Sequence, residues 1–124
     1  MIPPKTDWTA ADCFELEDYN RIVSNLNELA AAKEVTSALA AGTHATILTG
    51  EDRGDIADVF NAVMYAAGLA YSVEAYRGGY WFNAAELNII ETGCMMATRA
   101  PGAAAYNAGL IFDTGAKYGG GVVG

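Results

Sequence analysis

Basic residues are scarce in this sequence, and their scarcity excludes several classes of partner. Seven of the 124 residues are Lys or Arg, against fifteen Asp and Glu, so the formal net charge is −8. The basic residues are scattered singly, whereas duplex nucleic acid and anionic membranes are bound by clustered Lys and Arg. We therefore expect no nucleic acid and no membrane among the partners of this chain.

The sequence also has few residues that carry metal or nucleophilic chemistry. It contains a single histidine, His44, and two cysteines, Cys13 and Cys94, at spacings that match no zinc site. We interpret both cysteines as reduced packing residues, with a disulfide between them as the alternative. The acidic stretch 51–58 could hold a hard cation, but it lacks the ligand pattern of a calcium loop. We expect no catalytic residue, cofactor or metal ligand, and predict that the protein is not an enzyme.

Long apolar runs are missing as well. No run reaches the roughly 20 residues that span a bilayer, and the N-terminus lacks the basic-then-apolar layout of a signal peptide. Apolar residues nevertheless make up 52% of the chain, which is enough to build a core. These features predict one folded domain that enters no membrane.

A short motif is present three times: a large apolar residue, an Asn, any residue, and a β-branched apolar residue. The copies are Tyr19-Asn20-Arg21-Ile22, Phe60-Asn61-Ala62-Val63 and Leu87-Asn88-Ile89-Ile90. Asn is unfavourable inside a helix because its amide competes for backbone hydrogen bonds. We predict a shared structural task for Asn20, Asn61 and Asn88, in which each amide bonds the backbone of a neighbouring helix or of the incoming arm and so fixes the register. Contact with a partner protein is the alternative.

The spacing of apolar residues predicts three principal helices. The first covers about 15–32, the second about 56–72 with Asp55 as its N-cap, and the third runs from Asn83 to about Arg99. Asn83 and Glu86 have the spacing of a capping box. The Ala-rich stretch 31–41 either extends the first helix or forms a short helix of its own.

The remaining segments complete a mainly α fold with an extended N-terminal arm and a short C-terminal β-hairpin or strand. We divide the chain into an arm at 1–14, a helical domain at 15–100 and a Gly-rich extension with a short β element at 101–124. A lone strand and an extended arm are common means of linking subunits, because an unpaired strand edge seeks a partner.

Several apolar residues fall on the sides of helices that face away from the predicted core. In the third helix, Ile89 and Met96 lie roughly opposite Leu87, and in the second helix Leu69 lies opposite Phe60. A line of outward apolar residues suggests contact with another chain. Together with apolar residues of the two terminal segments, they form the predicted partner interface: Trp8, Leu69, Ile89, Met96, Ile111 and Phe112.

The N-terminal residues carry a recognisable pattern, Pro4-Lys5-Thr6-Asp7-Trp8, then Phe14, then Asp18-Tyr19-Asn20-Arg21-Ile22. With the later segment Glu86-Leu87-Asn88-Ile89-Ile90-Glu91, it resembles small virion structural proteins encoded in tail-gene regions of phages and prophages of Gram-positive bacteria. Those proteins have Arg where this chain has Ile89. The resemblance covers most of residues 4–95, and it implies a part of the tail tip, baseplate or fibre attachment region without catalytic residues.

These observations together predict a non-enzymatic structural subunit of a phage tail or tail-like particle. Its partners would be further copies of itself, as a homo-oligomer, and other virion proteins, and its location would be the virion. The alternative is a receptor- or carbohydrate-binding module of a virion, in which exposed aromatics such as Trp8, Tyr76, Tyr80 and Trp81 stack on sugars.

Overall fold

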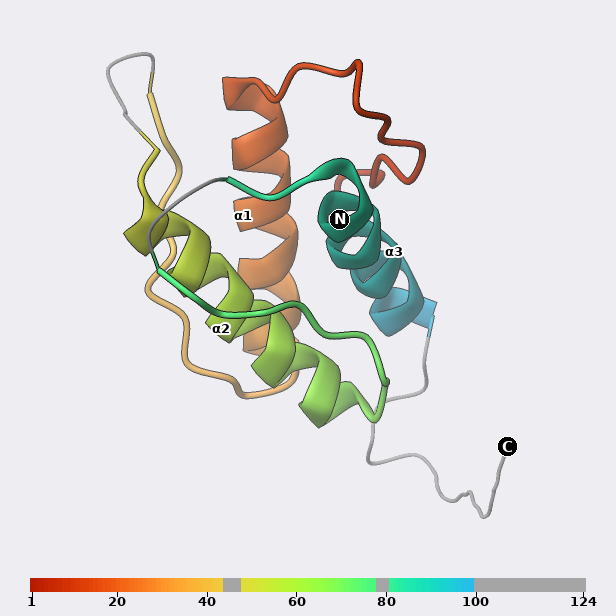
Figure 1. Cartoon of the computed structure of the whole chain (residues 1–124). Helices are drawn as coiled ribbons and strands as arrows, with labels where there is room; N and C mark the ends of the chain where they lie inside the picture. Colours follow the sequence, from red (N-terminus) through yellow and green to blue (C-terminus); the bar gives the residue numbers. More distant parts are fainter. Residues whose placement is uncertain (44–47, 78–80, 100–124) are drawn as a thin grey trace.

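Three helices form the framework of the molecule. The computed structural model describes residues 1–43, 48–77 and 81–99, and those ranges contain α1 (Leu16–Ala32), α2 (Gly50–Ala67) and α3 (Ala84–Arg99) and no strand (Figure 1). The mainly helical fold class with three principal helices is therefore confirmed. The predicted C-terminal β element at 101–124 lies outside the described residues.

The first and third helices begin where the sequence predicts. At the start of α1, Asp18 Oδ2 accepts a hydrogen bond from the Glu15 backbone N–H at 2.9 Å. At the start of α3, Asn83 and Glu86 bond each other reciprocally, with distances of 2.8 and 3.0 Å from backbone nitrogen to side-chain oxygen. A side chain at each N-terminus thus satisfies backbone donors that have no partner within the helix.

The second helix begins six residues before the predicted position, so the assignment of Asp55 as its N-cap is wrong. Thr49 is the N-cap, and its backbone N–H donates to Asp52 Oδ2 at 2.8 Å. Glu51 and Asp52 occupy the first turn of α2, where the helix dipole favours negative charge. The helix ends early because Gly68 adopts a left-handed conformation, with φ of 73°.

The Ala-rich stretch 31–41 is not helical beyond Ala32, contrary to both alternatives that its composition suggested. Glu34 has a φ of 59°, and the Val35 N–H donates to Ala30 O at 2.8 Å, which closes the end of α1. From Val35 to Ala40 the residues alternate between half-buried and exposed, as in an extended chain. Contacts of this segment with α1 therefore override its helix propensity.

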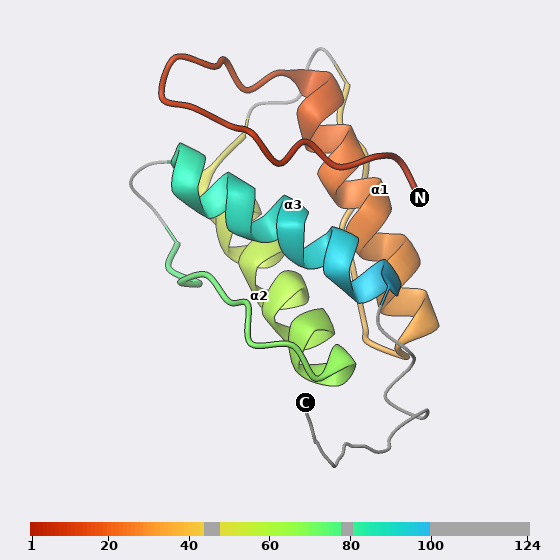
Figure 2. The same cartoon turned by 90° about the vertical axis from the view of Figure 1, so that its right-hand side faces the viewer.

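Extended segments lie along the three helices and connect them. The N-terminal arm passes across α1 and alongside the start of α3 before it turns back into α1 (Figure 2). Residues 35–43 run back beside α1, and residues 69–77 run back from the end of α2 toward α3. The core between the helices consists of residues that are almost completely buried: Ile22, Leu26, Ile56, Phe60, Val63, Met64 and Ile90.

Candidate functional site

The three recurring asparagines each bond both backbone groups of one residue in an extended segment. In every case the side-chain Oδ1 accepts from a backbone N–H, and the side-chain Nδ2 donates to the carbonyl of the same residue. The pairs are Asn20 with Gly42 (2.7 and 3.3 Å), Asn61 with Val73 (3.0 and 2.8 Å) and Asn88 with Trp8 (2.8 and 3.0 Å).

This arrangement gives each extended segment one of the pairings that a neighbouring strand would otherwise provide. A carboxamide carries one donor group and one acceptor, so it matches the N–H and C=O of a single residue. Asn25 of α1 makes the same pair of bonds with Ile2, both at 2.9 Å, although it lies outside the recurring motif. Its neighbours, Ser24-Asn25-Leu26-Asn27, do not match the motif, so the local sequence did not identify Asn25 as a residue that bonds the arm.

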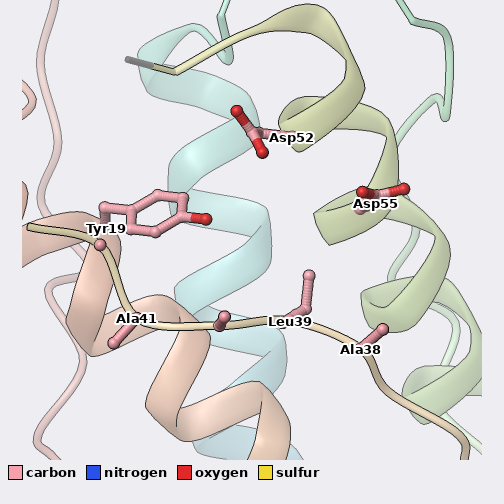
Figure 3. Close-up of a pocket in the computed structure, with 8 residues that line it drawn as sticks. Tyr19, Ala38, Leu39, Ala41, Asp52 and Asp55 are labelled. Atoms are coloured by element: carbon pink, nitrogen blue, oxygen red, sulfur yellow. The ribbon is translucent and has the colours of Figure 1, made fainter. Parts of the chain in front are cut away.

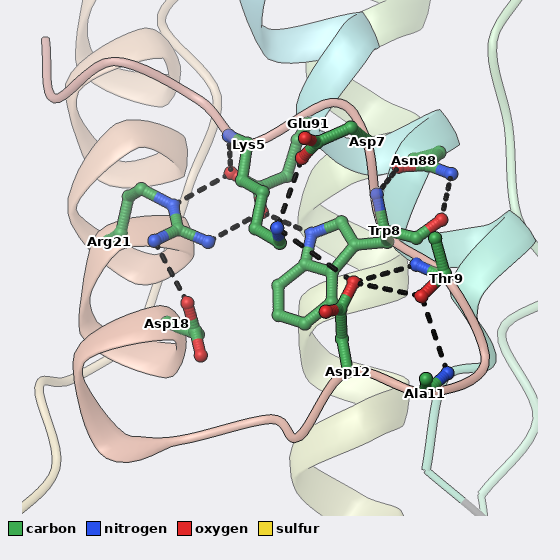
Figure 4. A network of polar contacts seen from close by, with 10 residues as sticks. All are labelled: Lys5, Asp7, Trp8, Thr9, Ala11, Asp12, Asp18, Arg21, Asn88 and Glu91. Atoms are coloured by element: carbon green, nitrogen blue, oxygen red, sulfur yellow. Dashed lines mark hydrogen bonds and ion pairs between the residues drawn. The ribbon is translucent and has the colours of Figure 1, made fainter.

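A buried carboxylate, Glu91 of α3, is the centre of a network of polar contacts between the arm, α1 and α3 (Figure 4). Its side chain is 1% exposed, and Arg21 of α1 binds it through two hydrogen bonds of 2.8 and 2.7 Å. The arm supplies two more donors, the Lys5 backbone N–H at 2.9 Å and the Trp8 indole Nε1 at 2.7 Å. The buried charge is therefore neutralised and fully hydrogen-bonded, which burial of a charge requires.

Trp8 does not lie on the surface as a partner-contact residue should. It is 5% exposed, its indole donates to Glu91, and its ring packs against Phe14 with centroids 5.8 Å apart. Phe14 in turn contacts Trp81, which is half-buried. The arm thus folds back and buries the indole against the helices of its own chain, which leaves little of Trp8 for a partner to contact.

Arg53 is a second buried charge, and no pattern in the sequence predicted its burial. Its side chain is 0% exposed and lies between the rings of Tyr76 and Phe82, 3.9 and 4.5 Å from their centroids. It donates to Glu86 of α3 at 2.7 Å and to the Glu74 carbonyl at 2.8 Å. Arg53 thus joins α2, α3 and the segment between them, as Arg21 joins α1 to α3.

Three of the four acidic residues in the stretch 51–58 are paired with Arg77. This guanidinium donates to Asp55 at 2.7 Å, to Glu51 at 3.0 Å and to Asp58. Its approach to α2 depends on Gly54, since a Cβ there would lie 2.5 Å from Arg77 Cγ. Within residues 1–43, 48–77 and 81–99, no three His, Cys, Asp or Glu side chains are arranged to hold a metal ion.

The other predicted interface residues are less exposed than the helix periodicity suggested. Leu69, Ile89 and Met96 are all half-buried, and Leu69 and Ile89 pack against the core. The periodicity assumed one buried face per helix, whereas the extended segments cover further faces. Ile111 and Phe112 lie outside the described residues. The sequence analysis missed Tyr65 of α2, which is 89% exposed.

The two cysteines differ in environment and are not bonded to each other. Cys13 is exposed in the arm, whereas Cys94 is buried in α3. Burial, followed by the nearby charge of Glu91, raises the pKa of the Cys94 thiol to about 12. The thiol of Cys94 is therefore protonated at neutral pH and acts as a small apolar group in the core.

Comparison with known proteins adds no relative to this picture. No family model, curated protein or solved structure matches the chain. In the described part of the chain, no helix is both long enough and apolar enough to cross a membrane. The functional argument therefore depends on the residues and their contacts alone.

Proposed function

We propose that this protein is a non-enzymatic structural subunit of a phage tail or tail-like particle, located in the tail tip, baseplate or fibre attachment region of the virion. It self-associates or docks on other virion proteins. The motif with Trp8, Phe14 and the Asn-containing helices supports this assignment through its resemblance to small virion proteins.

The proposal is supported chiefly by what the buried polar side chains bind. Glu91 and Arg53 are buried charges, and both bind extended segments to the helices. The paired bonds of Asn20, Asn61 and Asn88 do the same. An enzyme would direct such polar groups at a substrate. Here they hold the chain's own backbone in register, as expected of a structural protein.

The contact surface includes Met96 of α3. This side chain is half-buried on α3 and, unlike Ile89, is not packed against the core. Tyr65 is a second apolar group open to solvent. Exposed aromatic and Met side chains are enriched at protein interfaces. The alternative of a carbohydrate-binding module is less well supported, because Trp8 and Trp81 pack within the chain.

The proposal is tested by measuring the mass of the purified protein in solution with and without Met96→Asp. We expect the parent to form a complex with itself or with proteins of the particle, and the variant to lose at least about tenfold in affinity, since an Asp cannot be buried at an apolar contact. Ala85→Asp is the control, because Ala85 is exposed at the opposite end of α3. Equal assembly of parent and Met96→Asp would contradict the interface.

A further inference from the structure

The N-terminal arm is bound to the helices through every third residue, namely Ile2, Lys5 and Trp8. The side chains that bind them lie at least 23 positions away in the sequence. Pro3 and Pro4 lie between the first two of these contacts, and neither has an N–H that would need a partner. The arm is therefore held as an extended segment by bonds that do not involve the residues joining it to α1.

The side chains that hold the arm form what we call the arm site: Asn25 of α1 and Asn88 and Glu91 of α3. Asn25 and Glu91 are each 1% exposed, and buried polar groups need hydrogen-bond partners. The arm site is thus incomplete without an arm. A second copy of the chain supplies an identical arm, so it satisfies the same groups equally well.

Residues 9–13 connect the arm to the start of α1, and all of them are exposed. This connector is closed by a turn, in which the Asp12 N–H donates to Thr9 O at 3.1 Å and the Thr9 N–H donates to Asp12 Oδ2 at 2.8 Å. A pocket of about 290 Å³ lies between this turn and the start of α3. The connector is therefore held closed chiefly by its own bonds, and opening it costs one turn.

The other two extended segments do not have this freedom. Residues 35–43 lead from α1 to α2, and Leu39 of this segment lines a pocket of about 260 Å³ together with Tyr19 of α1 and Asp55 of α2 (Figure 3). Residues 69–77 lead from α2 to α3. Moving either segment to another copy would separate two helices that share one core, whereas moving the arm separates none.

We propose that the arm is exchanged between copies of this chain, so that the arm of one copy occupies the arm site of the next. Every bond between arm and helices is formed again in the exchanged pair, with the indole of one Trp8 donating to Glu91 of the other copy. Trp8 is then a buried contact between subunits. Exchange rests on the proposed self-association, because a short connector holds its own arm at an effective concentration of about 1 mM, which neighbouring copies must match.

The turn in the connector offers a matched pair of substitutions. Ala11→Pro removes the N–H that donates to Thr9 Oγ1 at 3.3 Å and places Pro third in the turn, where the commonest turn type disfavours it. Ala10→Pro places Pro second, where turns favour it. Exchange opens one turn in each copy. We therefore expect Ala11→Pro to lower the dissociation constant of the dimer at least about tenfold, and Ala10→Pro to leave it unchanged or raise it.

Light scattering of the full chains at concentrations up to about 1 mM measures the dissociation constant, and thermal unfolding checks that each variant is folded. A folded Ala11→Pro variant that stays monomeric over this range would overturn exchange.

Contacts between copies distinguish exchange from any other form of association. Copies of Ala11→Pro with and without ¹⁵N label are unfolded together in urea, refolded and examined by isotope-filtered NMR. We expect contacts between the Trp8 indole N–H of one copy and the Glu91 side chain of the other. A dimer without these contacts would overturn exchange but leave association through Met96 intact, so the two proposals fail separately.

Asp12→Ala provides a second variant in case Ala11→Pro does not fold. It removes the oxygen that accepts from the Thr9 N–H, and should lower the dissociation constant of the dimer about fivefold. Asp7→Ala is its control, because Asp7 is exposed and also pairs with Lys5, but it takes no part in the turn. Equal effects of Asp12→Ala and Asp7→Ala would contradict exchange, since the loss of a negative charge would then explain both.

Discussion

At the scale of single residues, the carboxamide explains how the extended segments keep their register. A backbone residue presents an N–H and a C=O, and among small side chains only an amide of Asn or Gln answers both at once. Asn61 binds Val73 in this way, and Asn88 binds Trp8. The recurrence of Asn in the sequence therefore identified the helix positions that make these bonds. The backbone residues that they bind, such as Val73 and Trp8, could not be predicted from the sequence.

The paired bond predicts that Asn61→Asp destabilises the protein by about 1–3 kcal/mol in urea unfolding. The Asp keeps an acceptor for Val73 N–H but sets a second oxygen against the Val73 carbonyl. Protonation restores the donor and is favoured in the folded state, which raises the folded-state pKa of the new carboxyl above its unfolded value of about 4. The deficit is therefore full at neutral pH, narrows as the pH falls through that raised pKa, and is smallest below about pH 4.

The control is Ala62→Asp, the neighbouring exposed position of α2, which should change stability by less than about 0.5 kcal/mol. Similar losses for Asn61→Asp and Ala62→Asp would show that charge alone, and not the pairing with Val73, causes the effect.

The two thiols predict a clear difference in reactivity toward a disulfide reagent at about pH 8, since the thiolate is the reactive form. Cys13 is exposed and should react in the native protein. Cys94 is buried with a pKa raised to about 12, and should react only after unfolding in urea. The variant Cys13→Ser should therefore show almost no native labelling; rapid labelling of that variant would contradict the buried position of Cys94.

At the scale of elements, periodicity identified all three helices but not all of their boundaries. The starts of α1 and α3 follow from local signals, such as the capping pair of Asn83 and Glu86. The start of α2 was missed because a run of charges resembles a turn, whereas Arg53 within it is buried against Tyr76 and Phe82. Burial of a charged residue depends on partners distant in the sequence, and periodicity carries no information about them.

The close packing of α2 and α3 predicts that Gly93→Ala is destabilising. A Cβ at Gly93 would lie 2.7 Å from two ring atoms of Phe60 and 2.9 Å from Met64 Sδ, and both of these side chains are buried. We expect a net loss of about 1–2 kcal/mol in thermal unfolding, because the overlap exceeds the gain in helix propensity of about 1 kcal/mol. Thr92→Ala, which adds no atom, is the control; a Gly93→Ala variant as stable as the parent would refute the close contact.

At the scale of the whole molecule, a small helical core is combined with three extended segments that it holds by polar contacts. The arm reaches α1 and α3 through Asn25, Glu91 and Asn88. The segment after α1 returns to Asn20, and the segment after α2 returns to Asn61. In this architecture the buried polar side chains hold the chain's own extended segments in place. We therefore infer a structural protein rather than a catalyst.

The most direct test of the structural-subunit proposal is to locate the protein in particles purified from the bacterium that encodes it. An antibody against the purified chain, visualised by electron microscopy with gold particles, should label one end of a tail or tail-like particle at a fixed position. Protein found entirely outside the particles, with no label on any tail, would contradict the proposed function.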